Sequence, residues 1–281
     1  MRFVFLGTGT SSGVPAVGCD CAVCRSADPR DRRLRTSAAL IFDDPQGNER
    51  VVLLDCGPDF REQALRAELK RLDAILLTHT HVDHTWGLDE VRRYNAIMGQ
   101  PIDLFADERT IEFVRHVYRH IFDRKLNVNE SFVASFITRR IEPLAPLDLW
   151  GLRITPLSLL HGKLPVLGFR IEGGRSRPGS DGPWGGARPP LPLAYMTDVS
   201  GIPPETWPHL RGLRTLVLDG LRHRRHPTHF TVGQAESVAR EVGAEATWLV
   251  HMSHDLPHAA TDAELPEGVR LAFDGLELGA R

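Results

Sequence analysis

Several features are scarce in this chain of 281 residues, and each scarcity excludes a class of protein. Only four cysteines are present, and three of them lie between Cys19 and Cys24, so no disulfide framework is expected. No apolar run approaches the roughly 18–20 residues that a membrane span requires, and we expect no membrane association. Neither charge dominates, because 34 Lys and Arg face 36 Asp and Glu. A net charge of −2 argues against a stable complex with nucleic acid.

The amino-terminal segment also lacks the features of an export signal. Its apolar stretch over residues 2–6 is short and enters a Gly-Thr-Ser turn at once. In a chain without such a signal, closely spaced cysteines favour metal binding over disulfides. We therefore expect a cytoplasmic protein.

Short strands dominate the predicted secondary structure. Short apolar runs, most of them rich in β-branched or aromatic residues and ending in Gly, Pro or Asp, predict strands over 2–6, 37–42, 50–54, 74–77, 102–105, 152–155, 166–171, 193–196, 215–218, 247–250 and 269–273. Helical periodicity covers residues 59–69, 88–98, 107–122 and 232–242. Strands outnumber helices, and helices recur in both halves of the chain. This order predicts an α/β layered sandwich, with helices outside packed sheets.

One segment has too few apolar residues to contribute to a core. Residues 173–192 are rich in Gly and Pro and are predicted to form a flexible surface loop between two strands. An insertion tolerated at the surface is the simplest explanation of this composition.

The strongest chemical signal is the series His79-x-His81-x-Asp83-His84, which directly follows the apolar strand 74–77. A loop that leaves a sheet edge can direct three imidazoles and a carboxylate into one small volume. These ligand types suit Zn, Mn or Fe. Four ligands in six residues exceed what one tetrahedral ion with an open position needs. Two ions sharing the cluster explain the motif better, for instance with His79 and His81 on one ion and Asp83 and His84 on the other.

Three residues of the second half are candidates for the remaining ligands of such a pair. His161, Asp198 and His251 each come after a predicted strand, where a sheet presents side chains at its rim. The carboxylate of Asp198 is able to span both ions. Any one of these residues alone would more often be structural, but the three together complete the first motif.

The cysteines Cys19, Cys21 and Cys24 require a fourth ligand to form a closed tetrahedral zinc site. His254 lies three residues after His251 and is the natural candidate; free thiols are the alternative. Cys56 stands alone at a strand end and is expected to be a small buried residue.

These motifs together resemble those of the metallo-β-lactamase superfamily. The matching series, in chain order, is Asp55, His79–His84, His161, Asp198 and His251. The opening Gly7–Pro15 and the cysteine cluster narrow the resemblance to the branch that contains phosphoribosyl 1,2-cyclic phosphate phosphodiesterase. The resemblance implies a single domain over residues 1–281 with a four-layer αβ/βα sandwich. It also implies two divalent ions at one edge of the sandwich.

The same resemblance implies roles for further residues. Asp55 would orient a ligand histidine through a hydrogen bond. Cys19, Cys21, Cys24 and His254 would bind one structural zinc.

A proton donor for the leaving group is expected in the segment before the helix 232–242. His229 is the first candidate, because His229-x-Thr231 resembles a catalytic stretch of the tRNA 3′-processing endonucleases. His226 is the second candidate, and Asp83, as a metal ligand, is also expected to be essential for catalysis. Both histidines could instead be ordinary surface residues.

Two groups of arginines are candidate phosphate contacts, although charge runs are usually solvated. The first group consists of Arg222, Arg224 and Arg225, and the second of Arg30, Arg32, Arg33 and Arg35.

The sequence therefore predicts a metal-dependent phosphodiesterase that acts on a small, cyclic phosphodiester. A thioester or other carbonyl-ester hydrolase and an RNA-processing nuclease are the alternatives. Mixed His/Asp sites accept Mn, Zn and Fe, so the residues do not select the metal. The segment 115–136, with its aromatic residues, is a candidate homodimer arm.

Overall fold

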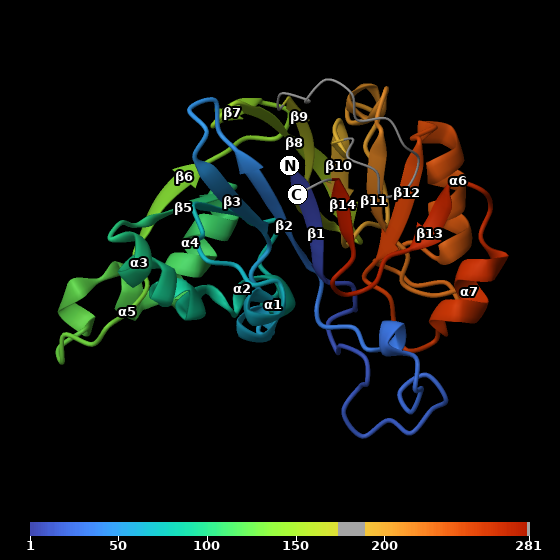
Figure 1. The fold of residues 1–281 in the computed structure, drawn as a ribbon, viewed down its shortest axis with the longest axis horizontal. Helices are drawn as coiled ribbons and strands as arrows, with labels where there is room; N and C mark the ends of the chain where they lie inside the picture. The colour runs from blue at the N-terminus through green and yellow to red at the C-terminus, as the bar shows by residue number, and fades with distance from the viewer. Residues whose placement is uncertain (174–188, 280–281) are drawn as a thin grey trace.

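The fold was analysed in a computed structural model of the chain, which describes residues 1–173 and 189–279. Most of the loop predicted over 173–192 therefore lies outside the described residues. Figure 1 shows two β-sheets packed face to face, with helices on both outer surfaces. The expected four-layer αβ/βα sandwich is confirmed.

Each sheet has seven strands, and each is part antiparallel and part parallel. The first sheet has the order β14-β1-β2-β3-β4-β5-β6, and its strands are β1 (Arg2–Gly7), β2 (Ser37–Asp43), β3 (Glu49–Leu54), β4 (Ala74–Leu76), β5 (Ile102–Ala106), β6 (Phe136–Arg140) and β14 (Glu277–Gly279). The second has the order β13-β12-β11-β10-β9-β8-β7, with β7 (Leu147–Leu149), β8 (Leu152–His161), β9 (Leu164–Gly173), β10 (Leu193–Met196), β11 (Thr215–Asp219), β12 (Ala246–Val250) and β13 (Val269–Leu271).

Helices cover the outer face of each sheet (Figure 1). On the first sheet lie α1 (Phe60–Arg66), α3 (Arg92–Met98) and α4 (Glu108–Val117), with the shorter α2 (Val82–Thr85) and α5 (Arg119–Phe122). The second sheet carries α6 (Val232–Val242) and α7 (His258–Glu264), with the short 3₁₀ helix η4 (Trp207–Leu210). The capping box expected at Thr231 and Gln234 begins α6. Within residues 1–173 and 189–279, no helix combines the length and apolarity needed to cross a membrane.

Alternation along the strands divides the core into layers. In β1, Phe3 and Phe5 point between the sheets, where they join Phe169 of β9 in one buried cluster. Val4 and Leu6 point to the opposite side and pack under the helices of the first sheet. Because successive strand residues face opposite sides, a continuous apolar strand supplies both layers at once.

Several element boundaries differ from the sequence prediction. The strand predicted over 152–155 continues to His161, so His161 ends a ten-residue strand rather than lying in a loop beyond it. The helix predicted over 107–122 is broken at Tyr118, where φ −99° and ψ 40° depart from helical geometry. The edge strand β6 was not predicted. Its partly exposed sequence, FITRR, lacks the buried apolar run that identifies the inner strands.

The strand directions bring the predicted site residues to one edge of the sandwich. Strands β3 and β4 are parallel neighbours in the first sheet, and β10, β11 and β12 are parallel neighbours in the second. Strand β8 is antiparallel to β9, which is antiparallel to β10, so β8 and β10 run the same way. Since the carboxyl ends of parallel strands meet at one sheet edge, residues that follow these strands gather there.

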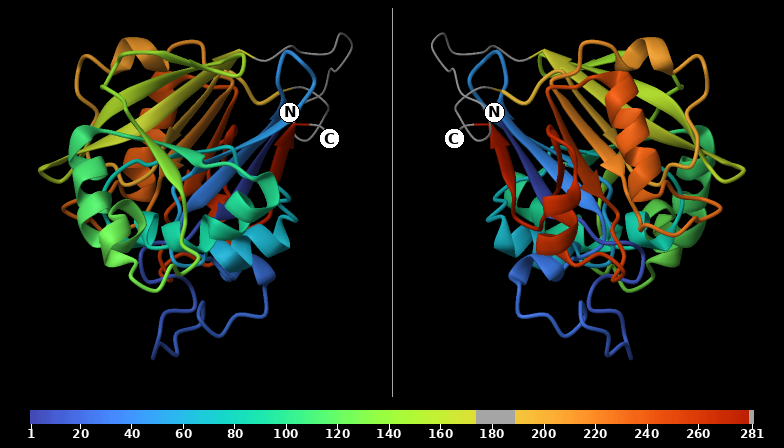
Figure 2. Two further views of the ribbon diagram at one scale, coloured as in Figure 1. Left: turned by 90° about the vertical axis from the view of Figure 1, so that its left-hand side faces the viewer. Right: turned by 90° about the vertical axis from the view of Figure 1, so that its right-hand side faces the viewer.

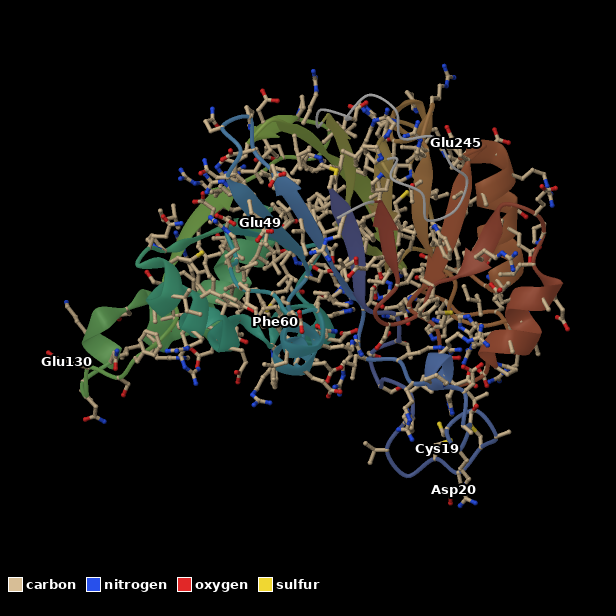
Figure 3. The ribbon with its side chains drawn as sticks, viewed as in Figure 1. Cys19, Asp20, Glu49, Phe60, Glu130 and Glu245 are labelled. Atoms are coloured by element: carbon tan, nitrogen blue, oxygen red, sulfur yellow. The ribbon has the colours of Figure 1, made fainter. Side chains whose placement is uncertain are left out.

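The segment between β1 and β2 projects from the body of the protein (Figures 1 and 2). Cys19 and Asp20 are near the tip of this projection (Figure 3). It contains the whole cysteine cluster.

Replacing Phe169 by alanine should lower the free energy of unfolding by about 3–5 kcal/mol, because this side chain is fully buried between the sheets and its loss leaves a cavity. Phe132→Ala is the matched control, because Phe132 is 58% exposed and should cost far less. Urea unfolding followed by circular dichroism measures both values. Equal losses in the two variants would contradict this account of the core.

Candidate metal centre

The loop after β4 presents the four residues of the first motif. His79 and His81 precede α2, while Asp83 and His84 lie in its single turn. His79, Asp83 and His84 are buried, and His81 is more exposed. The motif therefore places its side chains in a compact group, as the spacing predicted.

Three residues of the site have a left-handed backbone, which residues other than glycine seldom adopt. Asp55, Asp198 and His251 have φ values of 60°, 55° and 61°. Asp55 and His251 directly follow β3 and β12, and Asp198 is the second residue after β10. Such conformations persist only where surrounding structure enforces them, and they gather at functional sites.

The carboxylate of Asp198 occupies the centre of the cluster. Its Oδ2 lies 3.1 Å from Nε2 of His84, while its Oδ1 lies 3.3 Å from Nε2 of His251 and 3.9 Å from Nε2 of His79. His79 and His84 belong to the first half of the chain, and Asp198 and His251 to the second. The site is thus assembled across the two sheets.

Two overlapping ligand sets share Asp198. One consists of His79, His81 and Asp198, and the other of Asp83, His84, Asp198 and His251, with one ligand atom per residue and all atoms of a set within 4.8 Å of one another. His161 lies beside the first set, with its ring centroid 5.1 Å from that of His81. The pair His79 and His81 thus falls in one set and the pair Asp83 and His84 in the other, and Asp198 belongs to both.

The donor atoms of these sets fit divalent metal ions. Nε2 of His79, His84 and His251 is buried and has no hydrogen-bond partner among the described residues. A buried polar atom without a partner is costly, so convergent imidazole nitrogens of this kind require a common ligand. Mixed imidazole and carboxylate donors suit zinc, manganese and iron, which leaves the identity of the metal open.

Hydrogen bonds behind the ligands set the orientation of their rings. Asp55 Oδ2 is 2.8 Å from Nδ1 of His84 and also accepts the hydroxyl of Thr78 at 2.9 Å. Thr78 Oγ1 lies 2.8 Å from Nδ1 of His79. Because Nδ1 is occupied in both histidines, Nε2 is the nitrogen available to a metal.

The loop that carries Asp55 packs closely on α2. Cys56 donates its backbone N–H to the carbonyl of His84 at 2.8 Å, and its side chain is buried, as expected. A Cβ atom on Gly57 would lie 2.0 Å from the carbonyl oxygen of Asp83. Glycine is required here because two backbones meet at the metal motif.

The two sides of the cluster differ in charge. Burial lowers the pKa of His79 well below its usual value. Burial also opposes the protonation of His84 and His251, but the carboxylates of Asp198 and Asp83 outweigh it, which raises the pKa of His84 and brings the pKa of His251 to about 9. Protons on these two imidazoles compete with metal, so binding of metal should release them.

The cysteine cluster meets His254 as the spacing predicted. Nδ1 of His254 lies 3.1, 3.4 and 3.6 Å from the Sγ atoms of Cys19, Cys21 and Cys24. A backbone N–H from Cys24 stabilises the thiolate of Cys21 and lowers its pKa to about 6. Three thiols and one imidazole suit a closed tetrahedral zinc site.

Arg33, one of the basic run near this cluster, is buried rather than solvated. Its guanidinium donates to the backbone carbonyls of Ser253 at 2.9 Å and Leu256 at 2.6 Å, and it pairs with Asp31 at 3.2 Å. Asp31 in turn accepts the backbone N–H of His258 at 2.7 Å. Arg33 therefore connects the base of the cysteine segment to the segment that carries His251 and His254.

His229 lies against the metal ligands from the second sheet. Its ring centroid is 4.6 Å from that of His251, with the rings stacked, and 4.5 Å from that of His161. Nδ1 of His229 is 2.7 Å from Oδ2 of Asp219, which also accepts the backbone N–H of Val199 at 2.8 Å. His229 is thus held by a buried carboxylate and keeps Nε2 available.

The loop before His229 also supports a metal ligand. The carbonyl of Thr228 lies 2.7 Å from Nδ1 of His161. Burial lowers the pKa of His161 to about 4, which keeps the ring neutral and able to bind metal. His226, the second candidate proton donor, has its ring centroid 5.0 Å from that of His229.

The arginines of the first group are only partly available to a phosphate. Arg222 folds onto its own loop, and its Nη1 lies 4.0 Å from Asp255, which Arg224 also approaches at 3.4 Å. Over residues 1–173 and 189–279, no carboxylate pairs with Arg225. Arg225 is therefore the exposed member of the group whose charge no described carboxylate compensates.

Comparison with known proteins accords with this geometry. A family model described as a β-lactamase superfamily domain matches residues 50–252, which include the metal motif, His161, Asp198 and His251. The chain is a metallo-β-lactamase-fold hydrolase.

Among solved structures, this metallo-β-lactamase-fold hydrolase is similar to a diphosphatase from the PhnP family. The two are 40% identical with a TM-score of 0.84, and the match covers 100% of this chain and 98% of the other. Zn²⁺-bound PqqB from Methylobacterium extorquens shares the fold at 22% identity and a TM-score of 0.74, covering 100% of both chains.

A curated octanoyltransferase of Porphyromonas gingivalis (strain ATCC BAA-308 / W83) is 35% identical over 279 residues. The match covers 99% of this chain but 51% of that protein, so the hydrolase spans about half the length of this relative. Coenzyme PQQ synthesis protein B of Methylobacterium nodulans (strain LMG 21967 / CNCM I-2342 / ORS 2060) is 28% identical over 302 residues, covering 96% of this chain and 88% of the relative.

Sequence reasoning missed three residues that support the site. Asp219 ends β11 at the same edge as the other candidates, so its position after an apolar strand was a usable signal. No sequence signal indicated the supporting roles of Thr78 and Arg33, because a threonine beside a histidine and an arginine in a basic run are common at surfaces. Only their contacts distinguish them.

Metal content should separate the two candidate sites. Wild-type protein should bind about three ions per chain, Asp198→Ala about one, and Cys24→Ser about two, because each substitution removes a ligand of one site alone. Asp219→Asn is the control and should retain all three. Mass spectrometry of protein dialysed against metal-free buffer gives these values; full occupancy in Asp198→Ala would exclude Asp198 as the shared ligand.

Proposed function

We propose that this protein is a dinuclear metal-dependent phosphodiesterase that hydrolyses a small, cyclic phosphodiester. The observation that carries the proposal is the contact of a carboxylate-held histidine, His229, with the candidate metal ligands His161 and His251. Such an arrangement combines a cationic site for the phosphate with a proton source for the leaving oxygen.

Two divalent ions, when bound, supply neutralisation of the phosphate charge and a water of near-neutral pKa as nucleophile. The residues behind them supply orientation. Asp55 and Thr78 hold the rings of His84 and His79, and Thr228 holds that of His161. Rings fixed in this way need little rearrangement when substrate arrives, and this preorganisation lowers the barrier.

Proton transfer to the leaving group is assigned to His229. With Nδ1 bonded to Asp219, the Nε2–H of a protonated His229 is the group that can donate to the departing oxygen. The buried carboxylate of Asp219 fixes the ring through Nδ1, and the backbone N–H of Val199 holds that carboxylate in place. Asp219 does not touch substrate in this scheme and is a positioning residue.

A diphosphate diester is the second candidate substrate, favoured by the 40% identity to a diphosphatase from the PhnP family. Hydrolysis would then break a P–O–P bond, and the leaving group would be a phosphate. Arg225, which has no carboxylate partner in the described parts of the chain, would meet that second anionic group. A thioester has no second anionic group, so thioester hydrolysis would not account for the arginines of this loop.

Substrate profiling of fully metallated protein tests the proposal. We expect turnover of bis(p-nitrophenyl) phosphate and of a ribose 1,2-cyclic phosphate; faster turnover of a nucleoside diphosphate sugar would favour the second candidate. Hydrolysis of either kind of substrate requires the candidate metal ligands around Asp198, so Asp198→Ala should lower kcat by at least about 100-fold. Hydrolysis of an acyl-CoA thioester with no turnover of any phosphate substrate would refute the phosphodiesterase assignment.

His229→Ala should lower kcat by about 10²–10⁴-fold for a phosphodiester with an alkoxide leaving group, because that oxygen needs a proton. The same variant should lose much less activity on bis(p-nitrophenyl) phosphate, whose nitrophenolate leaves without one. Asp219→Asn should show the same selectivity with a loss of about 10–100-fold.

Steady-state kinetics with both substrates measures this selectivity, and His226→Ala is the matched control from the same loop. Metal content must stay at the wild-type level in all three variants. An equal loss on both substrates would show that His229 does not act as the proton donor.

A further inference from the structure

A cavity lies on the outer face of the second sheet, away from the metal centre. It has a volume of about 290 Å³ and is lined by Arg153, Arg170, Glu172, His209 and Arg211, with Leu144, Pro146 and Pro208 among its apolar neighbours. None of these residues belongs to the candidate metal centre. Along β8, Arg153 is eight residues from His161, which corresponds to about 26 Å at the rise of a strand.

The strand register explains why charged residues gather here. Arg153 of β8 pairs with Glu172 of β9, and Thr155 pairs with Arg170. The intervening Ile154 and Ile171 point into the core between the sheets, so these pairs face outward. Further along the two strands the same outer face is apolar and packs under the cover of α6 and η4. The cavity begins where this cover ends.

One arginine of the cavity is rigidly held. Arg170 Nη1 donates to the backbone carbonyls of His209 at 2.6 Å and Arg211 at 2.8 Å, and Nη2 donates to Oε1 of Glu172 at 2.7 Å. Its side chain is only 12% exposed. A guanidinium fixed by these bonds presents its remaining N–H groups without further loss of side-chain freedom.

The cavity also has an excess of positive charge in a protein whose net charge is −2. Three guanidinium groups face a single carboxylate, Glu172, and that carboxylate is already paired with Arg170. Neither Arg153 nor Arg211 forms a salt bridge within residues 1–173 and 189–279. Two unpaired arginines beside a fixed one match the needs of an anion with several oxygens.

We propose that this cavity binds a small organic phosphate, with the dianionic phosphoryl group on Arg153, Arg170 and Arg211. The apolar residues Leu144, Pro146 and Pro208 would contact the organic part. The volume suits a ligand of a few carbon atoms rather than a polymer. This site is independent of the proposed hydrolytic activity.

Calorimetric titration of the metal-loaded protein at low ionic strength tests the site, with phenylphosphonate and inorganic phosphate as probes. Phenylphosphonate resists hydrolysis because its phosphorus is bonded to carbon. The double variant Arg153→Gln/Arg211→Gln should lose at least about tenfold in affinity for the part of the binding that does not occur at the metals. The control Arg93→Gln/Arg109→Gln removes the same charge from exposed helix positions and should bind as wild type.

Glu172→Gln separates this proposal from a loss of folding, because it should strengthen binding by removing the competing carboxylate. Phenylphosphonate should bind more tightly than inorganic phosphate, since only the former has an apolar group. Hydrolysis by both double variants should equal that of wild type, so failure of the anion site would leave the proposed function unaffected. Equal binding by the two double variants, or no gain in Glu172→Gln, would overturn the proposal.

Discussion

The arrangement of the site depends on one buried carboxylate, that of Asp198, placed among imidazoles from both sheets. A charge removed from water is costly unless opposite charges or metal ions compensate it. Here His84 and His251 lie within 3.1 and 3.3 Å of the carboxylate oxygens. Their proximity lowers the pKa of Asp198 despite the opposing effect of burial. The two halves of the chain are therefore joined at the site by electrostatics as well as by the apolar core.

At this edge the backbone adopts unfavourable conformations that place the side chains of the site. Asp55, Asp198 and His251 adopt left-handed conformations within two residues of the ends of their strands. These conformations cost roughly 1–3 kcal/mol per residue, and they place a carboxylate or imidazole against the other residues of the cluster. The packed sheets on either side supply the stability that holds these turns in place.

The cysteine segment is connected to the catalytic edge by more than its zinc ligands. Met252 exchanges backbone hydrogen bonds with Thr8 and Thr10, on either side of Gly9, while Arg33 holds the carbonyl of Ser253. His251 and His254 lie on this short stretch and belong to different metal sets. The backbone contacts of Met252 and Ser253 therefore connect the projecting segment to the stretch that carries His251.

The sequence by itself determined the layered fold and which candidate ligands and cysteines lie together, because these depend largely on local patterns. Apolar strands can be identified from composition, and a motif such as His79–His84 brings its side chains together within one loop and one helical turn. The continuation of β8 to His161 was missed, since Pro156 and the Leu-rich stretch after it obscure the alternation of a strand.

Only the tertiary structure decided what each remaining polar residue does. Contacts between distant segments or neighbouring loops place a carboxylate behind His229 and bury Arg33. They also pair Arg222 and Arg224 with Asp255. The same holds for the cationic cavity, where strand register and the end of the helical cover bring Arg153, Arg170 and Arg211 together. A local pattern specifies which way a side chain leaves its own strand or helix, but its partner is specified by how the sheets pack and which strands end at the same edge.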